Sequence, residues 1–281
     1  MKTWKKIILG VSLISLFLGG GLVAWGYSQG GLTDLQNQTK SEQDYVKKEV
    51  KDFNKIDIKS SSYNVLIKNG DVNKATLSYY QKTKNPIDTS VKDGKLTIND
   101  NNSELDSTSN KHINFFGLKD LVRLSTLNEE VRNKTIVITL PKKQTIDFLK
   151  VDLATGNLDL SNSTIKQADI NLNVGDLTFT KMIVSNLKAN LDVGSVDSDR
   201  TLFTNSDLSI AMGDYSGDNL IFNGHNKLDV TSGNIELALK DYMLNVQADS
   251  HSGEVDITNN LKISKDNTLT ITSDLGDITV E

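Results

Sequence analysis

Seven glycines recur at nearly constant spacing through the C-terminal half of the chain, and this repeat restricts the possible folds more than any other feature. The intervals between them are 19, 19, 19, 20, 20 and 23 residues. Similar sequences surround each one, as in INLNVGDLTF and LDVTSGNIEL. The glycines are Gly156, Gly175, Gly194, Gly213, Gly233, Gly253 and Gly276. Self-similarity at a period near 20 residues is typical of a solenoid, in which each repeat forms one coil.

Apolar residues alternate on both sides of each glycine, which indicates strands with one buried face. With the glycine at position 0, they recur at −5, −3, +2 and +4, and often at −1. The alternation breaks between −1 and +2, so we expect a corner at the glycine, which reaches positive φ without a Cβ clash. A polar side chain, usually a short one, follows each glycine, and we expect it to form a hydrogen bond within its own turn.

Further apolar clusters lie about ten and about seven residues before each glycine, so two or three short strands are expected in each coil. Equivalent strands of successive coils would pair in parallel, about 4.8 Å apart. Two earlier segments fit the same pattern, with Tyr63 and Gly94 in the place of the repeat glycine. The sequence therefore predicts an all-β solenoid of about nine coils that begins near Phe53 and whose first coils are irregular.

Residues 7–27 form a candidate transmembrane helix, because they contain no charged side chain. A helix of this length spans about 30 Å, enough to cross the hydrocarbon core of a bilayer. Three lysines in residues 1–6 place the amino terminus in the cytoplasm and the rest of the chain outside the membrane. A cleaved signal peptide is the alternative, although residues 22–24 form a poor cleavage site. We expect an uncleaved signal anchor, a polar tether at residues 28–52 and an extracellular domain at residues 53–281.

Composition and motifs exclude several classes of function. The chain has no cysteine and only three histidines, which argues against thiolate sites and zinc sites. Its formal net charge is −5 and it has no compact basic stripe, so we expect no binding of nucleic acid. Nucleotide-binding, zinc-protease and serine-hydrolase motifs are absent. We therefore expect no cofactor, no metal ion and no catalytic residue.

Aspartates near the repeat corners are the candidates for a different interpretation. A glycosidase needs two carboxylates roughly 5–9.5 Å apart in a cleft, and stacked coils produce such spacings by their geometry alone. A cleft lined by paired aspartates beside Arg200 would favour a polysaccharide-active enzyme. Calcium is a further alternative, although the glycine-rich nonapeptide of calcium-binding β-rolls is absent. We expect these residues to lie at corner turns and on solvated faces. They are Asp176, Asp197, Asp199, Asp214 and Asp218.

An insertion at residues 101–134 interrupts the repeat, and its chemistry differs from that of every coil. Part of it has the spacing of an amphipathic helix with an apolar stripe. One interpretation is a cap that packs on the open end of the stack. The other is a docking surface for a partner protein or for the membrane. The candidate partner surface consists of Phe115, Phe116, Leu118, Leu121 and Val122.

Several segments together carry a resemblance to a known family. The anchor, the opening FNKIDIKSSSYNVLI, DGKLTI, ITLPKK and the serial L-x-V-x-x-G-[DN]-[LIV] phrases resemble the bacterial putative-adhesin β-strand-repeat family of unknown function. The resemblance covers residues 53–281 and implies a single-stranded, right-handed parallel β-helix on a membrane or envelope protein. Some members are associated with Lia-type envelope-stress systems of Gram-positive bacteria. The family has no catalytic motif, so no site residue is carried over from it.

These observations predict a non-enzymatic, membrane-anchored scaffold or interaction protein of the bacterial cell envelope, with a role in the stress response. The expected partners are the membrane, through residues 7–27, and an envelope protein or a cell-wall polymer. An adhesin that binds cell-surface or matrix ligands is the first alternative. A polysaccharide-active β-helix enzyme is the second.

Overall fold

The computed structural model describes residues 43–82, 86–100, 134–241, 243–258 and 260–281. These residues contain 25 β-strands and no helix. No membrane-spanning helix is therefore found in this part of the chain, and the predicted anchor at residues 7–27 lies outside it. Residues Asp44–Glu281 form one compact unit. The sequence-based prediction of an all-β fold is confirmed for the described residues.

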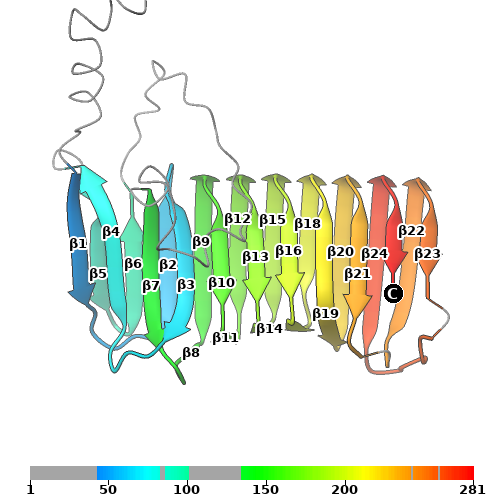
Figure 1. Cartoon of the computed structure of the whole chain (residues 1–281), viewed down its shortest axis with the longest axis horizontal. Helices are drawn as coiled ribbons and strands as arrows, with labels where there is room; N and C mark the ends of the chain where they lie inside the picture. Colours follow the sequence, from blue (N-terminus) through cyan, green and yellow to red (C-terminus); the bar gives the residue numbers. More distant parts are fainter. Residues whose placement is uncertain (1–42, 83–85, 101–133, 242, 259) are drawn as a thin grey trace, which may run out of the picture. The chain divides into compact units, whose positions relative to one another are not determined.

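Two sheets build the unit (Figure 1). The ten-stranded sheet has the spatial order β22 (Asn245–Ser252), β24 (Thr268–Leu275), β20 (His225–Ser232), β18 (Asp207–Met212), β15 (Leu187–Val193), β12 (Ala168–Val174), β9 (Phe148–Thr155), β2 (Lys55–Ser60), β6 (Lys95–Asn99) and β5 (Asp88–Lys92). The fifteen-stranded sheet has a long arm and a short arm that share β19. The long arm consists of β1 (Gln43–Glu49), β4 (Thr76–Lys82), β7 (Thr135–Pro141), β3 (Asn64–Gly70), β10 (Leu158–Ser161), β13 (Leu177–Thr180), β16 (Val196–Asp199), β19 (Tyr215–Asn223), β21 (Ile235–Leu239), β25 (Ile278–Val280) and β23 (Val255–Ile257). The short arm consists of β8 (Thr145–Ile146), β11 (Thr164–Ile165), β14 (Ile183–Ser185), β17 (Leu202–Thr204) and the end of β19.

Each regular coil contains one strand of the ten-stranded sheet, one of the long arm and one of the short arm. Successive coils pair in parallel and in register, so that Leu158 lies beside Leu177 and Leu177 beside Val196. Within the described residues, nine strands of the ten-stranded sheet and nine of the long arm are joined in this parallel way. This agrees with the predicted number of coils. Strand β1 lies within the predicted tether, so the ordered unit begins before Phe53.

Columns of matching apolar side chains fill the interior of the stack. The column that contains Leu158, Leu177 and Val196 continues to Tyr215 and Ile235, and its members are at most 3% exposed. Burying one such side chain stabilises the fold by about 1.5–3 kcal/mol. In the neighbouring column the large Phe179 is followed by the small Ser198, whose hydroxyl pairs with the Tyr215 hydroxyl at 3.0 Å. The burial of Tyr215 raises the pKa of its phenol.

The structure places the repeat glycines between the ten-stranded sheet and the long arm, at the corner where one coil comes closest to the next. Gly194 has a φ of +147°. A Cβ atom on Gly194 would lie 1.9 Å from the carbonyl oxygen of Gly175 in the preceding coil. Both the backbone conformation and the distance between coils therefore require glycine here.

The polar residues that follow the glycines form a ladder between coils. The backbone N–H of Asp176 donates to Asn157 Oδ1 at 3.0 Å, and the N–H of Ser195 donates to Asp176 Oδ1 at 3.0 Å. The prediction of hydrogen bonds within each turn was therefore wrong, because the side chain of one corner accepts from the backbone of the next coil. In spatial order the ladder consists of Asn64, Asn157, Asp176, Ser195, Asp214, Asn234, Asp277 and Glu254.

Ser195 is the weakest step of this ladder, because its Oγ accepts from the Asp214 N–H at 3.4 Å. We expect Ser195→Asn to shorten that hydrogen bond and to raise the free energy of unfolding by about 0.5–1 kcal/mol. The measurement is the midpoint of chemical unfolding. Ser216→Asn, on an exposed outer face, is the control and should change stability by less than about 0.5 kcal/mol. Equal effects of the two substitutions would contradict the role of the ladder.

The other two corners of most coils use residues other than glycine at positive φ, although Gly224, with a φ of 66°, occupies one of them. The corner between the long and the short arm has φ values of 49–56° at Asn162, Lys181, Arg200 and Asn219. The corner that returns to the ten-stranded sheet has φ values of 47° at Asn186 and 55° at Asn205. Asparagine tolerates this conformation better than most residues. In the sequence, the 19-residue spacing of Asn186 and Asn205 would have predicted this corner, but only the glycine spacing was interpreted.

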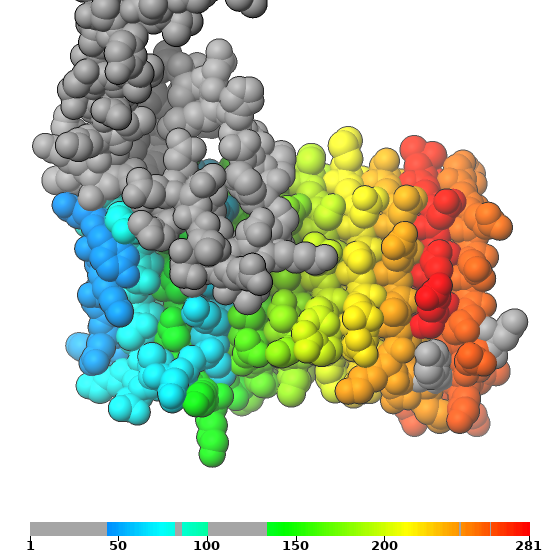
Figure 2. All heavy atoms as spheres, viewed as in Figure 1, coloured from blue at the N-terminus to red at the C-terminus, as the bar shows by residue number. Residues whose placement is uncertain are grey.

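The order of the coils in space differs from their order in the chain at the C-terminal end. Strand β24 lies between β20 and β22, and β25 lies between β21 and β23. Figures 1 and 2 show this order directly, with the red band of β24 inside the orange band of β22. The coil that ends the sequence is therefore enclosed by two coils that precede it.

The N-terminal end has a similar exchange of order. Strand β2 lies between β9 and β6, while the antiparallel strands β5 and β4 flank β6 and β7. Tyr63 occupies the place of a repeat glycine, as predicted, because Val65 lies beside Leu158. The alignment of Gly94 was wrong: Gly94 is in the turn between β5 and β6, so the strand after it joins the ten-stranded sheet.

Candidate functional site

The candidate acidic residues are distributed over two different parts of the stack. Asp176 and Asp214 belong to the corner ladder, where each accepts a backbone hydrogen bond. Asp199 and Asp218 are neighbours in adjacent strands of the long arm. The Arg200 guanidinium lies 2.5 Å from the Asp199 carboxylate, which raises the pKa of Arg200 through a hydrogen bond and through charge. The structure thus places Asp176 and Asp214 in the corner ladder and Asp199 in a surface ion pair with Arg200, while Asp197 lies on the same strand as Asp199 and Asp218 lies on the next one.

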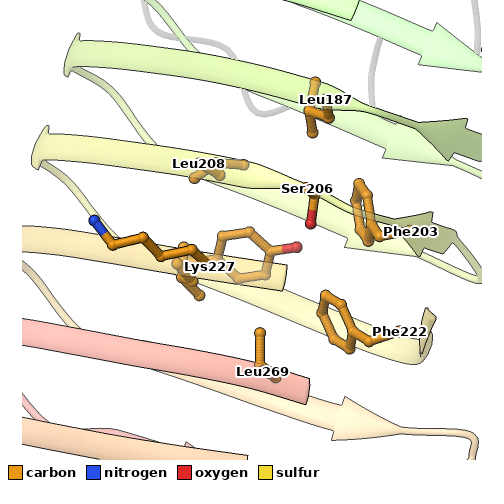
Figure 3. A pocket seen from close by; sticks show the side chains of 9 residues that line it. Leu187, Phe203, Ser206, Leu208, Phe222, Lys227 and Leu269 are labelled. Atoms are coloured by element: carbon orange, nitrogen blue, oxygen red, sulfur yellow. The ribbon is translucent and has the colours of Figure 1, made fainter. Parts of the chain in front are cut away.

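Two hollows lie in the C-terminal half of the stack, along strands β18, β20 and β24, and neither is lined by these aspartates. The first is an internal space of about 10 Å³ bordered by Phe203, Phe222 and Leu269 (Figure 3). A space of this size holds at most about one water molecule. The second is a polar depression on the surface, where His225 Nδ1 lies 3.1 Å from Thr268 Oγ1. Within the described ranges, no group of three or more His, Cys, Asp or Glu side chains is arranged to hold a metal ion.

Apolar side chains form an exposed row along the glycine corner. Val193 is 39% exposed, Met212 is 59% exposed and Leu275 is 55% exposed. They occupy position −1, and each is in register with the corresponding residue of the next coil. We call the row of residues at this position the corner ridge; it consists of Val174, which is partly exposed, Val193, Met212, the polar Ser232 and Leu275. The inward orientation predicted for position −1 was wrong, because the inward alternation ends at −3 and the corner starts before the glycine.

The predicted partner surface, Phe115 to Val122, lies outside the described residues. The corner ridge is the feature that sequence reasoning missed. Scattered exposed apolar residues are ordinary on protein surfaces, whereas adjacent exposed apolar residues such as Val193 and Met212 are a candidate interaction site. The sequence shows apolar residues at position −1, directly before the repeat glycine, but the alternation of apolar and polar residues predicts that they face the core. The corner ridge is therefore the candidate binding surface of the described unit.

Asp159 is a second residue that the sequence did not single out. It lies on strand β10 of the long arm and is 2% exposed. Burial raises the pKa of its carboxyl group to about 6, while the charge of Lys68 acts in the opposite direction. An ionised carboxylate at this position is therefore destabilising, because it loses its hydration.

This shift predicts a pH dependence of stability. Because the folded pKa lies above the unfolded one, the stability contributed by Asp159 is greatest below about pH 4 and falls as the pH rises through about 6. We expect Asp159→Asn to remove this fall and to raise the free energy of unfolding at pH 7 by roughly 2 kcal/mol. The free energy of unfolding of both proteins is measured by chemical denaturation at pH 4, 5, 6 and 7. The exposed Asp192→Asn is the control, and a wild-type profile that does not change between pH 4 and 7 would contradict the prediction.

Residues 53–281 match the model of the Toastrack DUF4097 family. No curated protein matches the chain. A putative cell adhesion protein from Clostridium sporogenes is 18% identical, with a TM-score of 0.35, over 85% of this chain and 98% of its own.

Two further solved structures are similar at the same level. A putative adhesin from Bacteroides fragilis is 15% identical, with a TM-score of 0.35, over 85% of this chain and 97% of its own. A putative lipid binding protein from Parabacteroides distasonis is 11% identical, with a TM-score of 0.35, over 85% of this chain and 97% of its own. Structural similarity at this level assigns no activity to the chain. The family match, in contrast, covers residues 53–281.

Proposed function

Since the chain belongs to the Toastrack DUF4097 family through residues 53–281, we propose that it is a non-enzymatic scaffold or interaction protein of the bacterial cell envelope. In this proposal residues 7–27 remain as a single-pass anchor, with the amino terminus in the cytoplasm. The solenoid, with right-handed coils, then stands outside the membrane. The proposal includes a role in the envelope-stress response of a Gram-positive bacterium, because the sequence resembles the bacterial putative-adhesin β-strand-repeat family, of which some members are associated with such systems.

The corner ridge is the observation that carries this proposal. Its side chains repeat once per coil, so a partner that binds one coil can extend along several. Asp176 and Asp214, at the glycine corner, accept hydrogen bonds from the backbone, and Asp199, at the opposite end of its strand, pairs with Arg200, which gives these three residues structural roles. A regular surface of this kind favours recognition of an extended protein or cell-wall polymer over catalysis on a small molecule.

The test is a variant that removes the apolar character of the ridge while preserving the coil. Val193→Ser combined with Met212→Ser is suitable, because Ser232 already occupies the equivalent position. Ile183→Thr is the matched control: Ile183 is 48% exposed on the short arm, and Thr164 occupies the same position in the preceding coil. Full-length protein would be crosslinked in membranes and, separately, incubated with purified peptidoglycan.

We expect the double variant to lower recovery of the bound protein or polymer by about tenfold and the control to leave it unchanged. Equal recovery with the double variant would show that the ridge is not the contact surface. Failure to recover any protein or polymer with the wild-type chain would overturn the scaffold proposal. Binding to intact neighbouring cells or matrix polymers would instead favour an adhesin.

A further inference from the structure

The end of the stack formed by β22 and β23, which we call the outer end, is open. Strand β22 pairs only with β24, and β23 only with β25, so no strand of the described residues covers their outer edges (Figure 1). The columns of core side chains therefore end in solvent here. Ile278 is 0% exposed, whereas Val255, its neighbour in the outer coil, is 38% exposed. The other columns end in side chains that are only partly buried, which are Val246, Ala248 and Ile257.

Strand β22 also presents free backbone groups along its outer edge. The N–H of Asn245 donates to the carbonyl oxygen of Asn267, on the side of β24. In a parallel ladder, alternate residues of a strand bond to the neighbour on one side. The N–H and C=O groups of Val246, Ala248 and Ser250 are therefore directed outwards. An edge that combines such groups with apolar side chains readily pairs with another strand.

The opposite end of the stack is protected against such pairing, whereas the outer end is not. Its edge strands are β1 and β5, and β5 runs antiparallel to β6. Charged side chains on an edge strand discourage pairing with another edge. The sequence of β1 is QDYVKKE and that of β5 is DTSVK, so both carry acidic residues and lysine. The sequence of β22 is NVQADSHS, in which Asp249 is the one acidic residue and lysine is absent.

We propose that the outer end binds the outer end of a second copy of this chain, with β22 antiparallel to β22 of the other copy across a twofold axis. A second copy fits both edges at once, because it presents two sheet edges with the same separation. The eight residues of β22 and the two sheets give an end face of about 26 by 20 Å. Two such faces bury roughly 1,000 Å², near the lower limit for a specific interface. The dimer is therefore expected to be reversible.

The residues of β22 also select a register for the pairing. When Ala248 lies opposite itself, all three outward-directed residues exchange hydrogen bonds, because Val246 then lies opposite Ser250 of the other copy. Asp249 lies opposite Gln247 of the other copy, so no two like charges meet. A register centred on Asp249 would bring two carboxylates together, which is unfavourable.

The pairing does not depend on the membrane anchor or on the corner ridge. It joins two stacks into one particle that carries two corner ridges. An extended polymer could then be bound at two places, which strengthens binding without any new contact. Only this consequence rests on the proposed function, because the pairing itself is measured without any ligand.

Gln247 allows a test that changes charge at the interface and leaves the core untouched, since its side chain is exposed. Gln247→Glu places two like-charged pairs with Asp249 in the dimer, and Gln247→Lys places two ion pairs there. We expect the first to raise the dissociation constant about fivefold and the second to lower it about fivefold. Sedimentation equilibrium of the full-length chain in a mild detergent measures both.

Ser216→Glu and Ser216→Lys make the same changes of charge on the exposed face of the long arm, and they should leave the dissociation constant unchanged. A wild-type chain that stays monomeric at about 100 µM would overturn the inference. Shifts of the same sign for Gln247→Glu and Gln247→Lys would also overturn it, as would shifts that the Ser216 variants reproduce.

A second measurement uses the absence of cysteine from the chain and tests the register. Ala248→Cys places a thiol opposite its own copy, with the Cα atoms about 5.5 Å apart, which a disulfide can span. Gln247→Cys is the matched control on the same strand. Its side chain is more exposed, but the two copies are diagonal to each other at about 7–8 Å, which is too far.

The full-length variants are oxidised under the same conditions and compared by electrophoresis without reductant. We expect Ala248→Cys to form the disulfide-linked dimer about tenfold faster than Gln247→Cys. Random collisions would instead favour the more exposed Gln247→Cys. Equal rates, or faster crosslinking of Gln247→Cys, would contradict the proposed pairing.

Discussion

Removal of residues 267–281 is expected to prevent cooperative folding of the C-terminal half of the stack. The deletion takes away β24 and β25, whose Leu269, Ile271, Ile278 and Val280 are at most 1% exposed. At about 1.5–3 kcal/mol each, these four side chains account for roughly 6–12 kcal/mol of burial, comparable to the whole net stability of a typical domain. The loss also opens a gap between β20 and β22, because β24 joins them.

The matched control is a longer internal deletion that we expect to be tolerated. Removing residues 243–265 eliminates the outer coil and shortens the interval between Gly233 and Gly276 from 43 to 20 residues. An interval of 20 residues already separates Gly213 from Gly233. Strands β20 and β24 keep their present pairing, with His225 beside Thr268. The main loss is the outermost coil, whose strand β22 is only partly buried.

Chemical unfolding monitored by circular dichroism, with solubility as a second measurement, distinguishes the two deletions. We expect the 243–265 deletion to unfold in one cooperative transition and the 267–281 deletion to be insoluble or to unfold without one. In a stack whose spatial order followed the chain, the shorter C-terminal deletion would be the milder change. That reversed result would contradict the enclosed position of the last coil.

Gly194→Ala is expected to lower the free energy of unfolding by about 3–5 kcal/mol. Part of the cost is conformational, since a φ of +147° is a region that residues other than glycine adopt at a cost of about 1–3 kcal/mol. The larger part is steric. The new methyl group would lie 1.9 Å from the Gly175 carbonyl oxygen, and only a shift of one coil relative to the next relieves the contact.

Gly94→Ala is the control that separates these two costs. Gly94 also has a positive φ, of 70°, but a Cβ atom there meets only the side chain of Asn54, at 3.2 Å. We expect it to lower the free energy of unfolding by about 1 kcal/mol. Urea unfolding of both variants measures the difference. If Gly94→Ala costs as much as Gly194→Ala, close stacking of the coils is not what requires glycine at the corner.

The repeated elements could be predicted from sequence because each coil carries its own pattern. Alternating apolar residues on both sides of Gly175 identify two strands and the corner between them, and repetition supports the same interpretation in every coil. Tyr63 was placed correctly for the same reason, since Val65 and Ile67 retain the alternation. Periodicity reports which side chains face a common interior, and that information is local.

Features that depend on the neighbouring coil could not be predicted in this way. Asp176 bonds to the backbone of the next coil, although its type and position suit a bond within its own turn. Met212 is exposed because the chain leaves the strand direction before the glycine, which alternation does not reveal. Asp159 is at an outward position of its strand, where alternation predicts exposure, yet it is buried.

The glycine repeat by itself determined that the chain forms a parallel solenoid and which side chains fill most of its interior. Only the tertiary structure decided the order in which the coils stack. Each coil presents nearly the same apolar columns and the same corner spacing, so almost any coil can pair with any other in register. The choice depends on how the chain connects the coils and closes the two ends. For that reason Gly276 stacks on Gly233, and Gly253, which precedes it in the chain, lies beyond it.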